Sequence, residues 1–125
     1  MRSVLVAIVF VVLATESFAG ERRVRAVVTA YCPCRKCCGK YADGKTATGR
    51  SAYLPGCAVD PKRVRYGSTI RIPPVNGFPA FSVVADDTGS AMRRSKRIHI
   101  DLRFKTHAEA LRFGRNNVWV RISTR

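Results

Sequence analysis

Residues 97–104, RIHIDLRF, alternate between apolar and polar side chains and therefore predict a β-strand. The face of this strand that we expect in the core consists of Ile98, Ile100, Leu102 and Phe104. The opposite face carries Arg97, His99, Asp101 and Arg103. Asp101 is the one acid on this basic face. It is either part of a surface ion pair, worth about 0–1 kcal/mol, or a functional carboxyl group.

Other short apolar stretches predict the rest of the fold. We expect further strands over residues 23–31, 57–60, 68–72, 80–85 and 118–122, a cysteine-rich loop over 32–40 and one helical turn over 61–65. Asn76-Gly77 is a strong turn signal. Thr106 and Glu109 form a capping-box pattern at the start of the one clear helix, residues 106–113, which Gly114 can end. The pattern indicates a mainly β protein: a small closed barrel of about six strands, with one short helix near the C-terminus.

The first 19 residues have the pattern of a secretory signal peptide. Arg2 gives a positive start, residues 4–14 are apolar, and Ser17-Phe18-Ala19 has the small-x-small form of a cleavage site. This apolar run is shorter than the roughly 20 residues that a membrane-spanning helix needs. We therefore expect cleavage after Ala19, no stable membrane anchor afterwards, and a single secreted or periplasmic domain over residues 20–125.

The composition is strongly basic. The chain has 23 Lys and Arg against 8 Asp and Glu, a formal net charge of +15. Such a charge attracts polyanions, which outside a bacterial cell are wall polymers or lipid headgroups. Nucleic acid would also suit the charge. We do not expect it, because export argues against it and the Phe and Tyr residues do not interleave with basic residues as stacking platforms do.

Acids are scarce, yet two of them stand together in residues 83–89, VVADDTG. Strand alternation places Asp87 on the same face as Val83 and Ala85, and Asp86 on the opposite face. A third acid, Asp60, precedes Pro61, where it could cap the following turn. Each aspartate therefore has a structural explanation when it is considered singly.

Together, five segments resemble the bacterial three-aspartate ("3D") domain, which is related to the catalytic domain of membrane-bound lytic transglycosylase A. These segments are TAY, TATGR, AVDPKRVRYGSTIRIP, ADDTGSAM and HIDLRFKTHAEALRFGRNNVWV, in that order from about residue 29 to residue 120. The resemblance implies a double-psi β-barrel with three aspartates in one groove. By motif these are Asp60 (Val-Asp-Pro), Asp87 (Asp-Thr-Gly) and Asp101 (Ile-Asp-Leu).

The resemblance also implies an activity. Lytic transglycosylases cleave the MurNAc–GlcNAc β-1,4 bond of peptidoglycan and leave 1,6-anhydro-MurNAc ends, with the aspartate of the Ile-Asp-Leu strand, here Asp101, as general acid and base. Such an acid needs a raised pKa. Asp60 and Asp87 would raise the pKa of Asp101, whereas Arg103 and a charged His99 would lower it, so the sequence leaves the direction open.

We expect the substrate, a peptidoglycan glycan strand, to contact residues around these motifs. The candidates are Thr88, Gly89, Arg93, Arg94, His99 and Arg103. Arg93 and Arg94 belong to the link SAMRRSKRIHI between the last two motifs, which is longer and more basic than is usual in the family. This basic link is either a lip that holds anionic glycan or a solvated loop. A noncatalytic cell-wall binding module is the alternative to an enzyme.

Five cysteines remain to be explained: Cys32, Cys34, Cys37, Cys38 and Cys57. Disulfides would suit an exported small domain and are the favoured interpretation. Five thiols cannot all pair within one chain. Cys34-x-x-Cys37 has metal-ligand spacing, so a bound zinc ion is the alternative to the expectation of no cofactor. A catalytic thiol is the least favoured interpretation, because the sequence shows no clear histidine partner.

Overall fold

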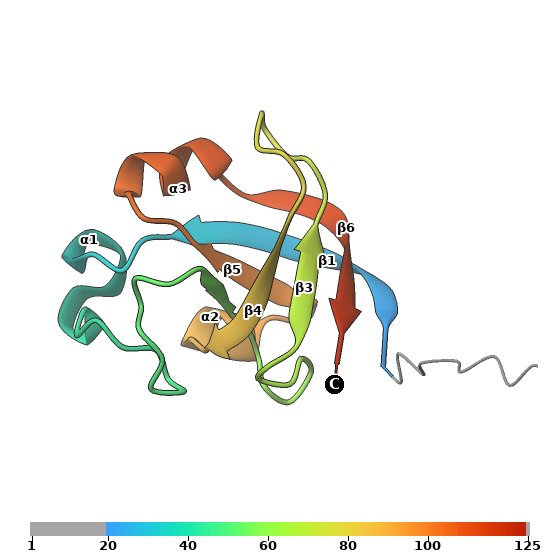
Figure 1. Cartoon of the computed structure of the whole chain (residues 1–125), viewed down its shortest axis with the longest axis horizontal. Helices are drawn as coiled ribbons and strands as arrows, with labels where there is room; N and C mark the ends of the chain where they lie inside the picture. Colours follow the sequence, from blue (N-terminus) through green and yellow to red (C-terminus); the bar gives the residue numbers. More distant parts are fainter. Residues whose placement is uncertain (1–19, 125) are drawn as a thin grey trace, which may run out of the picture.

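In a computed structural model, residues 20–124 are described and form a closed six-stranded barrel (Figure 1). The strands are β1 (Arg22–Tyr31), β2 (Gly56–Ala58), β3 (Thr69–Ile72), β4 (Phe81–Asp87), β5 (His99–Arg103) and β6 (Asn116–Ser123). Their order around the barrel is β1-β5-β2-β4-β3-β6, and β6 pairs again with β1. The predicted mainly β barrel is confirmed. The predicted signal peptide lies outside the described residues.

The strand order is not the chain order. β1 pairs in parallel with β5 and antiparallel with β6. Likewise, β2 pairs in parallel with β4 and antiparallel with β5. β1 therefore lies between β5 and β6, and β2 lies between β4 and β5. In each case the two outer strands are antiparallel and consecutive in the chain, as in a ψ motif, and β5 takes part in both arrangements. This interleaving brings segments that are far apart in the sequence side by side.

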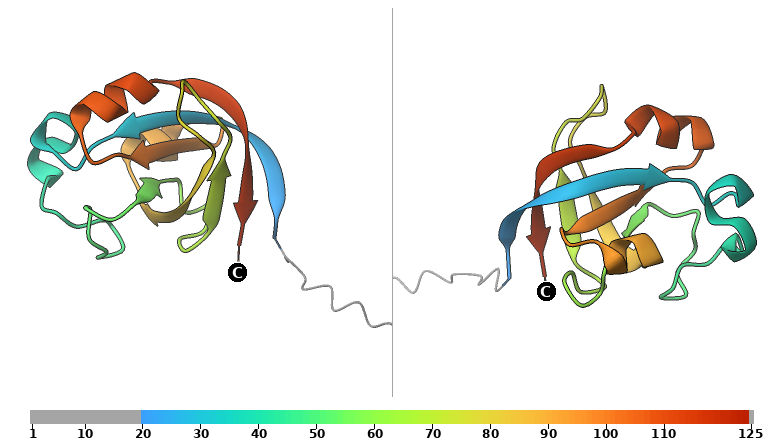
Figure 2. Two further views of the ribbon diagram at one scale, coloured as in Figure 1. Left: turned by 45° about the horizontal axis from the view of Figure 1, so that its top comes forward. Right: turned by 180° about the vertical axis from the view of Figure 1, so that it is seen from behind.

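Short helices cover the ends of the barrel. The predicted C-terminal helix is present as α3 (His107–Phe113): the Thr106 side chain accepts a hydrogen bond from the Glu109 N–H at 3.2 Å, and Gly114 ends the helix with a φ of 70°. The structure adds α1 (Arg35–Cys38), the 3₁₀ turn η1 (Gly39–Tyr41) and α2 (Ser90–Arg94). All three are too short to show a helical period in the sequence, which predicts a loop over residues 32–40, where α1 and most of η1 lie. Figure 2 shows α1 and α3 at the same end of the barrel. Within residues 20–124, no helix combines the length and the apolar character needed to cross a membrane.

The barrel interior is filled by the apolar faces of the strands. Ile100 and Leu102 of β5 are buried at 0% and 1% exposure, as their alternation predicts, whereas Ile98 and Phe104 are partly buried against the same core. Phe113 of α3 closes one part of this core and packs edge-on against Phe78. Burial of these side chains is the main favourable contribution to folding.

The predicted alternation fails at the end of β4. Cys57 of β2 lies opposite Ala85, but the next residue, Ala58, lies opposite Asp87, so Asp86 is the extra residue of a β-bulge. The prediction that Asp86 and Asp87 point to opposite faces is wrong, because the bulge inserts a residue into the alternation. Both carboxylates instead lie outside the core: Asp86 accepts a hydrogen bond from Arg103. Asp87 accepts one from the Tyr31 hydroxyl, to which Arg103 also donates.

A buried ion pair forms at this bulge. Arg103 of β5 donates to both carboxylate oxygens of Asp86, at 2.9 and 2.7 Å, and the two residues are only 7% and 2% exposed. Arg103 also donates to the Leu54 carbonyl, and Arg50 donates to Asp86 at 2.9 Å. Arg103 was expected on a polar, substrate-binding face. The loop that carries Leu54 covers it instead, and its guanidinium is occupied within the protein.

This pair requires the glycine opposite it. Gly56 of β2 lies across from Arg103 in the strand register. A Cβ at this position would approach Arg103 Nη2 and the Asp86 carboxylate closer than the 3.0 Å that real Cβ atoms respect. Since both groups are buried and fixed by hydrogen bonds, neither can move aside without breaking the pair.

We therefore expect Gly56→Ala to lower the free energy of unfolding by about 3 kcal/mol or more, through overpacking and a disturbed buried ion pair. Urea denaturation with matched m-values measures the change. Gly89→Ala is the control, because its φ of −160° suits any residue and its methyl group meets only the flexible end of Met92. A Gly56→Ala loss no larger than that of the control would contradict this account.

Candidate active site

Four residues form a row across four neighbouring strands on the outer side of the barrel. The register pairs Thr29 of β1 with Asp101 of β5, Asp101 with Ala58 of β2, and Ala58 with Asp87 of β4. The two aspartates are thus separated by one strand, or about 10 Å between their Cα atoms. Ala58 between them has only a methyl group, which leaves open space above the row.

A cleft of about 650 Å³ lies over this row. Its floor includes Asp87, Asp101 and Ala58. One wall is the end of β1 and the segment after it, with Tyr31, Cys37, Cys38 and Tyr41. Another is the connection from β4 into α2, with Thr88, Gly89 and Arg93. Such a volume is within the range of small-molecule binding sites.

Asp101 is the titratable group that stands out in the cleft. Burial of its carboxyl group raises the pKa from 3.8 to about 6, although a hydrogen bond from Thr29 acts in the opposite direction, and the nearby charge of Asp87 raises it further. Thr29 Oγ1 donates to Asp101 Oδ1 at 2.8 Å. The sequence left open whether the pKa of Asp101 is raised or lowered. In the structure it is raised, and burial of the carboxyl group is the main cause.

Thr29 also joins Asp101 to a histidine. His99 Nε2 lies 2.7 Å from Thr29 Oγ1. A hydroxyl group has one proton, so when Thr29 donates it to ionised Asp101, Thr29 Oγ1 accepts a hydrogen bond from the protonated Nε2 of His99. Burial, followed by the charge of Arg115, lowers the pKa of His99. The sequence predicts that His99 contacts substrate, but it does not line the cleft. Hydrogen bonds link it to Asp101 through Thr29.

Asp87 is held in place by donors from three segments. Its Oδ1 accepts hydrogen bonds from the backbone N–H groups of Ala47 and Thr88, both at 2.9 Å. Its Oδ2 accepts from the Tyr31 hydroxyl at 3.0 Å. Burial raises the pKa of Tyr31, so this hydroxyl remains a donor at neutral pH. Asp87 is therefore a fixed acceptor, whereas Asp101 has a single donor and an elevated pKa.

Asp60, the third motif aspartate, does not line the cleft. It is 8% exposed, its Oδ1 accepts from the Lys62 N–H at 3.1 Å, and its Oδ2 lies 3.6 Å from Arg63 Nε. Its carbonyl accepts from Val64 N–H at 2.9 Å, which forms the predicted single helical turn. The structure thus gives Asp60 the capping role that its position before Pro61 suggested, rather than a place beside the other two aspartates.

The basic link contributes four residues to the cleft lining, Ser90 to Arg93, and Arg93 is the one basic residue among them. Arg93 lines it and donates to Thr88 Oγ1 at 3.1 Å. Arg94 does not line the cleft, although it was a candidate for substrate binding. The link begins as the short helix α2, which carries both of these adjacent arginines.

The cysteines fall into two groups. Cys57 lies in the barrel core, away from the other four cysteines, so it is not available to share a disulfide or a metal ion with them. Burial raises the pKa of its thiol. Cys32 and Cys34 lie at disulfide distance, which supports the disulfide interpretation for this pair. Cys38 lines the cleft, but burial raises the pKa of its thiol, which does not favour a thiolate nucleophile.

Sequence reasoning missed several residues that shape this site. Thr29, Tyr31, Arg50, Gly56 and Asp86 received no role. Thr29, Tyr31 and Arg50 lie within the quoted segments TAY and TATGR, but their partners are 36 to 72 residues away in the chain. Among these residues, only Asp86 had a visible signal in the sequence, which is its position next to Asp87. The alternation predicted that the two side chains point to opposite faces, and the bulge places them on the same side.

Comparison of the chain with protein-family models gave no match, and comparison with curated proteins gave none either. The function proposed below therefore depends on the geometry of the cleft and on the resemblance of the five sequence segments.

Substitutions of Thr29 and Asp87 should shift the pKa of Asp101 in opposite directions. Thr29→Val removes a hydrogen bond to the carboxylate, so the pKa of Asp101 should rise above 6. Asp87→Asn removes a nearby negative charge, so the pKa should fall. Carbon-13 NMR titration of the aspartate carboxyl groups measures both shifts. Shifts of the same sign in the two variants would contradict the assignment.

Proposed function

We propose that the protein is an exported lytic transglycosylase-like enzyme that cleaves the MurNAc–GlcNAc β-1,4 bond of peptidoglycan, with Asp101 as general acid and base. The observation that carries this proposal is a carboxyl group with a pKa of about 6 on the floor of a cleft of about 650 Å³. The five motif segments supply the reaction class.

In this reaction Asp101 acts twice. Protonated Asp101 gives its proton to the glycosidic oxygen as the bond from that oxygen to the sugar C1 breaks. The carboxylate then takes the proton of the sugar's own 6-hydroxyl group as its oxygen bonds to C1, which closes the 1,6-anhydro ring. The proton balance is restored, and no water is consumed. One carboxyl group suffices, in contrast to the pair used by ordinary glycosidases.

Neighbouring groups would assist both steps. The elevated pKa lets Asp101 keep its proton up to about pH 6, where an ordinary aspartate is ionised, and the Thr29 hydrogen bond stabilises the carboxylate after the first step. Asp87, fixed by three hydrogen bonds, would place negative charge near the positive charge that develops on the sugar ring. The two carboxyl groups thus differ in role because their environments differ.

The direct test is digestion of purified peptidoglycan sacculi by the mature protein, with mass spectrometry of the released fragments. We expect fragments that end in 1,6-anhydro-MurNAc. Binding to sacculi without release of fragments would instead support the alternative, a noncatalytic wall-binding module. Release of reducing ends would indicate a hydrolase and would contradict the proposed chemistry.

Asp101→Asn should abolish fragment release and yet stabilise the fold near pH 7. The folded-state pKa is raised, so the folded protein holds a proton that the unfolded chain loses between pH 3.8 and about 6, and wild-type stability falls as pH rises through that window. At about 1.4 kcal/mol per pKa unit, ionisation costs the folded state roughly 3 kcal/mol. The amide avoids this cost, so its stability advantage over wild type should grow between pH 4 and 7.

Activity and denaturant unfolding of the same variant at several pH values test both parts. Wild-type activity should also fall as pH rises through about 6, because the acid form is lost. Asp43→Asn is the matched control, since Asp43 is an exposed aspartate that lines the same cleft. Wild-type activity in Asp101→Asn would exclude Asp101 as the acid and base.

The position of Arg93 predicts a salt-dependent contribution to substrate binding. Arg93→Gln should weaken sacculus binding at low ionic strength, and its difference from wild type should shrink as salt is added, because exposed charges are screened over about 8 Å at physiological salt. Arg94→Gln, outside the cleft lining, should have a smaller effect. Equal binding by the two variants across a salt series would mean that the basic link is only a solvated loop.

A further inference from the structure

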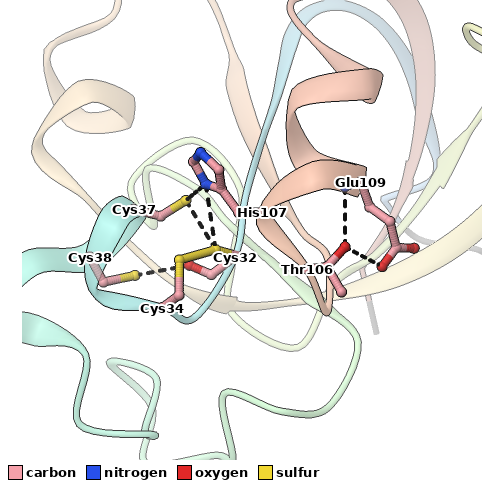
Figure 3. Close-up of a disulfide and its surroundings, with 7 residues drawn as sticks. All are labelled: Cys32, Cys34, Cys37, Cys38, Thr106, His107 and Glu109. Carbon is pink, nitrogen blue, oxygen red and sulfur yellow. Dashed lines mark hydrogen bonds between the residues drawn. A yellow bond between two sulfur atoms is a disulfide. The ribbon is translucent and has the colours of Figure 1, made fainter.

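Four side chains from two distant segments converge at the end of the barrel where α1 and α3 meet. They are Cys32, Cys34, Cys37 and His107, and their ligand atoms all lie within 4.8 Å of one another. Figure 3 shows the sulfur atoms gathered beside the His107 ring. Cys32 directly follows β1, Cys34 precedes α1, Cys37 lies within it, and His107 is the first residue of α3.

The separations suit a tetrahedral metal ion. Zinc–sulfur bonds of about 2.3 Å and zinc–nitrogen bonds of about 2.0–2.1 Å give ligand-to-ligand edges of roughly 3.5–3.8 Å. Cys37 Sγ lies 3.2 Å from Cys32 Sγ and 3.3 Å from His107 Nδ1, and Cys32 Sγ lies 3.9 Å from the same nitrogen. Shifts of a few tenths of an ångström would make these three edges equal. Cys34 Sγ is bonded to Cys32 Sγ in the disulfide, so reduction has to let it move away to the fourth corner of the site.

The donor set also suits zinc. Three thiolates and one imidazole form one of the standard structural zinc sites, and Cys34 and Cys37 have the usual two-residue spacing. The second pair that the sequence lacked is completed by Cys32, at the end of β1, and by His107, 75 residues further along the chain. A site filled by four protein ligands has no open position for substrate, which is typical of a structural ion rather than a catalytic one.

We propose that the reduced protein binds one zinc ion through Cys32, Cys34, Cys37 and His107. Binding releases the thiol protons to solvent and leaves three thiolates and the His107 imidazole on the ion. A disulfide between Cys32 and Cys34 uses two of the same sulfurs, so the disulfide and the zinc site are alternative states of one cluster. His107 distinguishes them, because a disulfide needs no imidazole.

The ion would fix one wall of the cleft. Cys37, Cys38 and Tyr41 belong to that wall, whereas His107 belongs to α3, which packs on the barrel core through Phe113. Zinc would connect the short α1 segment, none of whose residues is buried, to this rigid helix. Cys38 takes no part: its Sγ donates to the Cys32 carbonyl at 3.4 Å.

The experiment uses the full mature chain, purified under reducing, anaerobic conditions and stripped of metal with a chelator. Zinc is titrated against a chromophoric competitor, and cobalt(II) replaces zinc in a parallel spectroscopic titration. We expect one ion per chain, cobalt bands of a tetrahedral site with thiolate charge transfer, and a higher Tm with zinc. His107→Ala and Cys37→Ser should bind at least ten-fold more weakly, whereas Cys38→Ser and Cys57→Ser should bind like wild type.

The wild-type titration does not depend on whether the variants fold, and neither arm depends on enzyme activity. Failure of the reduced wild-type protein to bind a stoichiometric ion would overturn the proposal. So would octahedral cobalt bands without thiolate charge transfer, or a folded His107→Ala variant with wild-type affinity and spectrum.

Discussion

The buried ion pair between Asp86 and Arg103 is the interaction on which the site depends. Desolvating two charges is costly, and removing one partner from such a pair is costlier still, because the other charge stays buried. The chain meets this constraint with a second arginine, Arg50, with the Leu54 carbonyl, and with a glycine where any side chain would intrude. This one pair therefore constrains three parts of the fold. They are the bulge in β4, the loop that carries Leu54 and the position of β2.

From this pair, hydrogen bonds lead to the floor of the cleft. Arg103 donates to the Tyr31 hydroxyl at 3.1 Å, and that hydroxyl donates to Asp87. The position of Asp87 is thus set from below by buried groups, whereas Asp101 is left with one donor and partial burial. These two carboxyl groups lie on neighbouring parts of one sheet but have different hydrogen-bond partners, and burial raises the pKa of Asp101. Different environments are the usual way in which proteins assign acid and base roles.

The sequence predicted what depends on local periodicity. The strands around Ile100 and Leu102, the Asn76-Gly77 turn and the capped helix α3 are all present, because their signals lie within a few residues. The motifs also identified Asp87 and Asp101 as neighbours. Other expectations failed where distant segments decide the outcome. A loop some 50 residues earlier in the chain buries Arg103, a single inserted residue turns Asp86 and Asp87 to the same side, and His107 joins the cysteines only through the folded barrel.

Closure of the barrel also affects how copies of the protein meet one another. Each of the six strands in residues 20–124 has a hydrogen-bonded neighbour on both sides, so the sheet has no free edge where another chain could add a strand. Edge-to-edge pairing is a common start of aggregation, and the closed barrel of residues 20–124 offers no strand edge for it. The chain carries a formal net charge of +15, which repels a second copy. A closed sheet and a strong like charge therefore both oppose self-association of the domain.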